Sequence, residues 1–191
     1  YNYRKKQYNK ALNWFAKVDV YDLNNEELSE FYFKRGYSYF EEDSIGQAQK
    51  DFFEIKDIDN KYAAPATYYF GHASYLEKNY QTALEHFIKL KKNENFGPIV
   101  PYYIAQIFYL QQKYDSAIAY ATPLLDSTSK RVLELTKIIG ESYYRTSRYK
   151  ECLPFLEKYK SIMYALKRPE WYQLGYAYYK NAEYAKALDC F

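Results

Sequence analysis

The stretch WYQLGYAYYKNAEYAKALDCF, residues 171–191, carries the pattern that decides the fold. Trp171, Leu174 and Tyr178 are spaced by three and four residues, as on one face of a helix. After a short polar break, Tyr184 begins a second series of apolar residues with the same helical spacing. Two amphipathic helices joined by so few residues must lie antiparallel and side by side. We therefore expect a helical hairpin here.

The same hairpin pattern recurs along the whole chain. One column of small residues contains Gly36, Gly71, Ala105, Gly140 and Gly175, with spacings of 35, 34, 35 and 35 residues. A second small residue follows each of these by 12 positions, at Ala48, Ala83, Ala117, Cys152 and Ala187. This period predicts a single repeat domain over 1–191, with a partial repeat at 1–28, full repeats at 29–63, 64–97, 98–132 and 133–167, and a truncated repeat at 168–191.

These residues resemble the tetratricopeptide repeat (TPR) family. Trp171, Leu174, Gly175 and Tyr178 followed by Ala187 and Phe191 match its W-x2-L-G-x2-Y…A-x3-F pattern. The resemblance implies an all-α fold, a right-handed α-solenoid of stacked antiparallel helix pairs. The rival 35-residue architecture is the pentatricopeptide repeat, which reads RNA. The aromatic and Leu-Gly signature and the modest charge favour the TPR family.

Composition excludes several classes of function. The chain holds 27 Tyr, 12 Phe and 2 Trp, and its 27 Lys+Arg against 24 Asp+Glu leave a net charge of only +3. No dense basic stripe suggests a nucleic-acid partner. No apolar run approaches the roughly 20 residues that span a bilayer, so this segment is not expected to insert into a membrane. Frequent Tyr, Lys and Asn suggest a bacterial source and leave the cytoplasm and the cell envelope open.

Catalytic and metal-binding patterns are not evident in the sequence. The two histidines, His72 and His86, have no cysteine or carboxylate at metal-ligand spacing around them. Neither a phosphate-binding glycine loop nor a nucleophile motif is present. Cys152 and Cys190 fall on predicted buried helix faces and are interpreted as small apolar fillers. We expect a non-enzyme without cofactor or metal.

One face of the first helix in each repeat holds the candidate binding residues. They stand three before, one after and four after the small residue, which places them on one helical stripe. This candidate face consists of Phe33, Tyr37 and Phe40; Tyr68, His72 and Tyr75; Tyr102, Gln106 and Tyr109; Lys137, Glu141 and Tyr144; and Tyr172, Tyr176 and Tyr179. In TPR proteins this stripe resembles the lining of a concave groove. It is therefore expected to bind a peptide or helix of another protein, the alternative being that these rings only pack the fold.

Other interpretations stay open. The stripe has a single cation and no asparagine, so a clamp for a terminal carboxylate is not expected. Neither end carries a convincing polar cap, which suggests a piece of a longer protein. The repeats are then either an interaction scaffold, a structural spacer that self-assembles as a homo-oligomer, or the regulatory arm of a longer chain.

Overall fold

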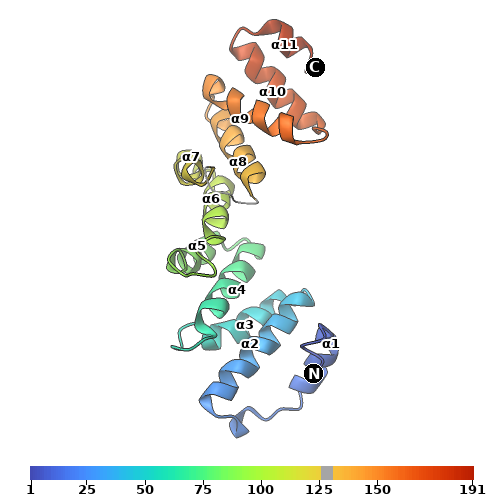
Figure 1. The fold of residues 1–191 in the computed structure, drawn as a ribbon, viewed down its shortest axis with the longest axis vertical. Helices are drawn as coiled ribbons and strands as arrows, with labels where there is room; N and C mark the ends of the chain where they lie inside the picture. Colours follow the sequence, from blue (N-terminus) through green and yellow to red (C-terminus); the bar gives the residue numbers. More distant parts are fainter. Residues whose placement is uncertain (126–130) are drawn as a thin grey trace. The chain divides into compact units, whose positions relative to one another are not determined.

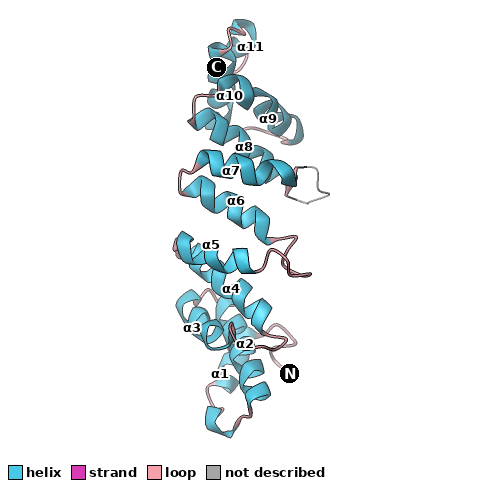
Figure 2. Cartoon of the chain, turned by 90° about the vertical axis from the view of Figure 1, so that its left-hand side faces the viewer, coloured by secondary structure: helices cyan, strands magenta, loops and turns pink. Residues whose placement is uncertain are grey.

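The computed structural model describes residues 1–125 and 131–191, and throughout these residues the regular structure is helical (Figures 1 and 2). The all-α class expected from the sequence is confirmed. The helices are α1 (Tyr8–Phe15), η1 (Val20–Asp22), α2 (Asn25–Glu41), α3 (Ile45–Ile55), α4 (Ala63–Leu76), α5 (Tyr80–Lys89), α6 (Val100–Leu110), α7 (Tyr114–Ala121), η2 (Thr122–Leu124), α8 (Val132–Arg145), α9 (Tyr149–Ile162), α10 (Arg168–Lys180) and α11 (Tyr184–Leu188).

The chain forms two compact units, Tyr1–Val100 and Pro101–Phe191. We call them the first and the second unit. The first contains α1 to α5, and the second contains α7 to α11 together with α6, which begins at the boundary. Residues 126–130, near the end of the expected repeat 98–132, lie outside the described residues. No helix in the described part is long and apolar enough to cross a membrane.

Antiparallel helix pairs arise from one kind of tight turn. The second residue after the first helix adopts the left-handed conformation, with φ between 58° and 61° at Asp43, Lys78, Gln112, Ser147 and Ala182; Lys6, in the turn before α1, has a φ of 55°. In the α4–α5 turn, the Asn79 N–H donates to the Ser74 carbonyl at 2.8 Å and the Lys78 N–H donates to Tyr75 at 3.0 Å. These two bonds define a Schellman motif, which satisfies the last carbonyls of a helix and reverses the chain.

Small residues let the two helices of a pair approach closely. A Cβ atom added at Gly71 would lie 3.2 Å from the Cβ of His86 and 3.2 Å from the ring of Phe87. The α6–α7 pair reaches the same close approach with two alanines. Ala105 and Ala121 stand where the α4–α5 pair has Gly71 and Phe87, and both alanines are fully buried. The small residue in one helix therefore matches the size of its partner in the other.

Each unit buries its own apolar core. In the first unit, Ala48, Phe52, Ile55 and Ala66 are buried between α3 and α4 together with Phe70. In the second unit, one cluster joins α7 and α8, and another joins α9, α10 and α11 around Cys152. Burial raises the pKa of the Cys152 thiol to about 12, which keeps it a neutral apolar filler as predicted. The same prediction is wrong for Cys190, which follows the end of α11 and is only partly buried.

In two of the helix pairs the second helix meets a proline, with different outcomes. α7 ends at Ala121 and tightens into the 3-10 turn η2, which holds Pro123. Pro154 lies inside α9, which continues around it from Tyr149 to Ile162. Pro169, by contrast, stands at the start of α10, where its missing N–H leaves no helical bond unmade.

Candidate functional site

In the first unit, the candidate face is closed by aromatic packing around Tyr69. The ring centroid of Tyr69 lies 5.1 Å from that of Tyr37, 5.3 Å from Phe40 and 6.2 Å from Phe33. It also stacks on the fully buried Phe52 at 5.5 Å. Tyr69 therefore joins the three candidate residues of α2 to the core, and edge-to-face contacts of this kind hold the rings in place.

His72, on α4, lies within this aromatic packing. Its ring centroid is 5.3 Å from that of Phe40, 5.8 Å from Tyr68 and 6.3 Å from Tyr75. The imidazole thus takes the place of one more ring in the wall, and its surroundings are aromatic. Nothing in these contacts resembles a metal site.

The candidate residues three positions before the small residue are Phe33, Tyr68 and Tyr102. Each is covered by a residue from the connection that leads to the next helix pair. Tyr62 lies 5.4 Å from Phe33, and Phe96 stacks on Tyr68 at 4.6 Å with an interplanar angle of 18°. The Arg131 guanidinium sits 4.2 Å from the centroid of the Tyr102 ring. Tyr68 is only 9% exposed as a result. Each of these three rings is therefore partly covered from within the chain.

The candidate tyrosines four positions after the small residue pack across the tight turn between the two helices of a pair. Each contacts the tyrosine that opens the second helix, with centroid distances of 6.0 Å for Tyr75–Tyr80, 5.8 Å for Tyr109–Tyr114, 5.6 Å for Tyr144–Tyr149 and 5.8 Å for Tyr179–Tyr184. This pairing brackets the left-handed residue of the Schellman turn. The tyrosines at this position therefore have a role in the fold, whatever else they contact.

In the second unit, the candidate face opens into a cavity of about 290 Å³ between α6 and α8. Five of the predicted residues converge on it, three from α6 and two from α8: Tyr102, Gln106, Tyr109, Lys137 and Glu141. Leu110, Leu133, Glu134, Ile138 and Tyr159 complete the lining. We call this the α6–α8 cavity.

A network of charged side chains forms one side of the α6–α8 cavity. The Lys137 ammonium lies 2.6 Å from Glu170 Oε1 and 3.8 Å from Glu141 Oε1. The Tyr109 hydroxyl donates to Glu141 Oε2 at 2.6 Å. The Tyr159 hydroxyl donates to Glu170 Oε1 at 3.2 Å, and the Lys167 N–H donates to Glu170 Oε2 at 2.8 Å. Glu170 thus has three donors, whereas Glu141 has one close donor.

The pKa values follow from this network. Burial acts to raise the pKa of Glu170, but its hydrogen bonds from Lys137 and from the Lys167 backbone outweigh burial and lower it. Burial acts to lower the pKa of Lys137, but the carboxylates beside it raise it. Burial and the hydrogen bond to Glu141 both raise the pKa of Tyr109. Lys137 and Glu170 are therefore a charged pair at neutral pH.

The last part of the candidate face is a row of tyrosines on α10. The rings of Tyr172 and Tyr176 stack at 6.1 Å with an interplanar angle of 15°. Tyr144 meets Tyr176 edge-on at 6.1 Å, which ties α8 to this row. Tyr172 and Tyr179 are 55% and 51% exposed, so the row presents ring surface to solvent.

Solved structures of helical-repeat proteins are similar to this chain. The C-terminal part of a TPR repeat-containing protein from Cytophaga hutchinsonii is similar with a TM-score of 0.74 at 16% identity, covering 99% of this chain and 76% of that one. MamA AMB-1 has a TM-score of 0.73 at 14% identity, covering 85% of this chain and 87% of that one. MamA residues 41 to the end from Desulfovibrio magneticus RS-1 has a TM-score of 0.70 at 14% identity, covering 86% and 92%.

The chain has a TPR-like helical-repeat fold. The resemblance read from the sequence is thereby confirmed at the level of the fold. No protein-family model matches the chain, and no curated protein sequence matches it.

Sequence reasoning on the TPR pattern missed three residues that shape this face. Tyr69 precedes Gly71 by two positions and so falls off the predicted stripe, although it is the ring on which the first unit's wall converges. Tyr159 and Glu170 come from α9 and from the start of α10. The only sequence signal for Glu170 was its place after Pro169, in the first turn of a TPR first helix, where a carboxylate favours the helix N-terminus.

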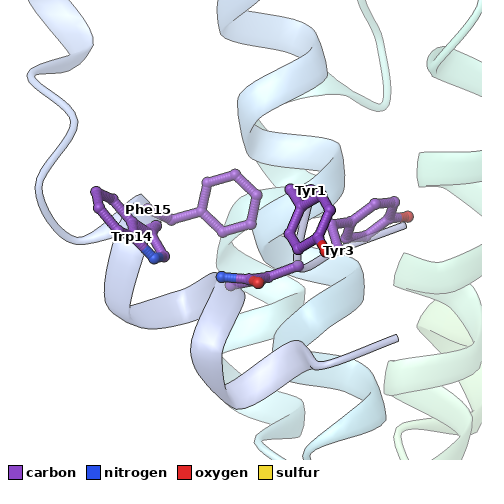
Figure 3. Close-up of a pocket in the computed structure, with 6 residues that line it drawn as sticks. Tyr1, Tyr3, Trp14 and Phe15 are labelled. Atoms are coloured by element: carbon purple, nitrogen blue, oxygen red, sulfur yellow. The ribbon is translucent and has the colours of Figure 1, made fainter. Parts of the chain in front are cut away.

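A second cavity, of about 400 Å³, lies beside α1. Figure 3 shows Trp14 and Phe15 on one side of it and Tyr1 and Tyr3 on the other. Trp14 is 63% exposed. Of the TPR stripe positions predicted to bind a partner, none lines this cavity.

Proposed function

We propose that this chain is a non-catalytic protein-interaction scaffold, and that a peptide or helix of a partner protein binds along the candidate face. The observation that carries the proposal is the α6–α8 cavity, where five residues of the stripe expected from the TPR resemblance line one hollow. Binding pockets are typically concave and apolar with a few placed polar groups. Three tyrosines, two leucines and an isoleucine with one lysine and two glutamates fit that description.

The second unit is the better candidate for the partner's anchor. In the first unit, Tyr69 and the loop residue Phe96 already occupy the rings that a partner would contact. In the second unit, Gln106 and Glu141 stand where the first unit has the rings of Tyr37 and His72, and both line the α6–α8 cavity. Tyrosine walls around such a hollow lose little conformational entropy on binding, because each side chain has only two rotatable bonds.

The proposal is tested by selecting binders from a displayed random-peptide library on the folded chain. Hydrogen exchange of the complex then maps the footprint, and we expect protection in α6 and α8. Gln106→Arg places a long side chain in the cavity and should abolish binding of the selected peptides. Gln47→Arg, at an exposed position of α3, is the matched control and should leave binding unchanged. Selected peptides that protect only α1 to α5, or that still bind Gln106→Arg, would contradict the proposal.

A second candidate function, self-association, is favoured by exposed apolar side chains. Trp14 in α1 is 63% exposed and Leu188 in α11 is 78% exposed. Tyr184 and Phe191, four residues before and three residues after Leu188, are also 63% and 68% exposed, and apolar side chains that gather on a surface mark an interface. Sedimentation across a concentration series should then show oligomers that Leu188→Asp disrupts, and a monomer at every concentration would remove this candidate.

A further inference from the structure

We propose that the α6–α8 cavity receives one cationic side chain, arginine or lysine, of the bound partner segment. This inference rests on the proposed scaffold function and names the chemistry of the anchor. Three observations support it: the size of the cavity, the nature of its walls and its balance of charges.

The size of the cavity suits a single side chain. Its volume of about 290 Å³ lies at the bottom of the roughly 300–1,000 Å³ range of ligand pockets. An α-helix with its side chains is about 10–12 Å wide and does not fit such a space. A partner helix or strand would instead lie across the mouth and insert one long residue.

The walls suit the stem and the head of a basic residue. Leu133 and Ile138 offer apolar surface to a methylene stem, which long cationic side chains bury readily. The tyrosine rings offer faces to a cation, an interaction worth about 0.5–2 kcal/mol. Rings of this cavity already bind cations within the chain: Lys137 lies 5.2 Å from the Tyr159 centroid, and Arg131 lies 4.2 Å from that of Tyr102.

The charges lining the cavity favour a cation over an anion. Among the lining residues, Glu134 and Glu141 are acidic and Lys137 is basic, while Arg131 and Arg145 contact the rings of Tyr102 and Tyr109 from outside the lining. Lys137 is held by Glu170 at 2.6 Å, whereas it is 3.8 Å from Glu141. The side chain of Glu141 is only 16% exposed, so an incoming ammonium or guanidinium would complete its shell with little competition from water.

Cations also stand at the two ends of the cavity, and they define the competing outcome. Arg131 packs on Tyr102, and Arg145 interacts with Tyr109. An acidic partner residue could pair with these arginines, but entering the cavity would bring it against the partly buried carboxylate of Glu141. The interior therefore favours the opposite charge from the rim, and the experiment includes an acidic probe.

The test uses three small probes on the full chain: the amides of acetylated arginine, citrulline and glutamate. Citrulline has nearly the shape of arginine without its charge. Methyl resonances of Leu133 and Ile138 report occupancy by NMR. We expect saturable shifts with the arginine probe and at least fivefold weaker binding of citrulline. Preferred binding of the glutamate probe, equal binding of arginine and citrulline, or no shift with any probe would each overturn the inference.

Two substitutions identify the groups responsible. Glu141→Gln should weaken the arginine probe at least fivefold, and Glu151→Gln, at an exposed position of α9, is the matched control. Lys137→Met removes the competing cation, so the arginine probe should bind at least twofold more tightly. If Lys137 only stabilised the fold, its loss would not strengthen binding. Unchanged or weaker binding by Lys137→Met would contradict the proposal. Circular dichroism checks that each variant is folded.

The two proposals fail in different ways. If the selected peptides protect α6 and α8 but lack a basic residue essential for binding, the cationic anchor is wrong and the scaffold stands. If no selected peptide protects the second unit, the scaffold proposal is wrong whatever the probes do.

Discussion

The two units carry different kinds of side chain at the same positions of the repeat. In the first unit, Tyr37 and His72 follow the small residue of their helices and join a continuous packing of rings around Tyr69. In the second unit, Gln106 and Glu141 occupy those positions, and a cavity of about 290 Å³ remains between α6 and α8. The position after the small residue is thus one place where rings of the first unit are replaced by polar side chains that line the cavity of the second.

The largest expected effect is the loss of the aromatic centre of the first unit. Tyr69→Ala removes a partly buried ring that contacts Phe33, Tyr37, Phe40 and Phe52, and it should cost about 3 kcal/mol of unfolding free energy, the lower end for aromatic-to-alanine changes in a core. Urea unfolding measures the loss, and hydrogen exchange should place it in α2 and α4. Tyr172→Ala, at an exposed ring of the second unit, is the control and should cost below about 1 kcal/mol. Similar losses for both would mean that Tyr69 is no packing centre.

The next effect tests the ionic network of the second unit. Glu170→Gln weakens the charge-assisted bonds from Lys137 and the Lys167 N–H and should cost about 1.5 kcal/mol at neutral pH. Because the folded-state pKa of Glu170 is lowered, its contribution is present above the ordinary value of 4.5 and is lost as the pH falls below it. Unfolding by urea at pH 7 and pH 3 should therefore show a smaller difference between wild type and variant in acid. A difference that grows in acid would contradict the charged pair, and Glu151→Gln should show no difference at either pH.

A smaller effect is expected where the small residue of one helix contacts a large side chain of its partner helix. Gly71→Ala adds a Cβ 3.2 Å from Phe87, and its overpacking cost of about 1–3 kcal/mol exceeds the roughly 1 kcal/mol gained in helix propensity. We expect a net loss of about 1 kcal/mol. In a Phe87→Leu background the added methyl has more room, so the same change should cost less than half as much. An additive double-mutant cycle would show that the two positions do not constrain each other.

The smallest effect is one that both units should share. Lys78 and Ser147 are left-handed residues in equivalent turns, with φ of 61° and 59°. Glycine adopts this conformation without strain, so Lys78→Gly and Ser147→Gly should each stabilise the chain by about 0.5 kcal/mol in thermal or urea unfolding. Lys50→Gly, inside α3 at an exposed position, should instead cost about 1 kcal/mol. Stabilisation in only one unit would show that the turns are not equivalent.

Part of the candidate site could be predicted from spacing alone. Tyr102, Gln106 and Tyr109 are separated by four and three residues, and a helix places such residues on one side, where they line the cavity. The covering residues could not be found this way. Phe96 and Arg131 come from connections between helix pairs, and their contacts with Tyr68 and Tyr102 depend on the path of those loops.

The sequence by itself determined the helical hairpin and its period. Gly71 and Ala83 are small because two helices must approach there, and this local requirement recurs every 34 or 35 residues, so it can be read without coordinates. Only the tertiary structure decided which face positions are filled. Tyr69 fills the candidate face of the first unit. In the second unit, Tyr159 of α9 lines the α6–α8 cavity and donates a hydrogen bond to Glu170 of α10. Contacts between successive helix pairs depend on how side chains of different repeats meet in space, and a one-dimensional period does not contain that information.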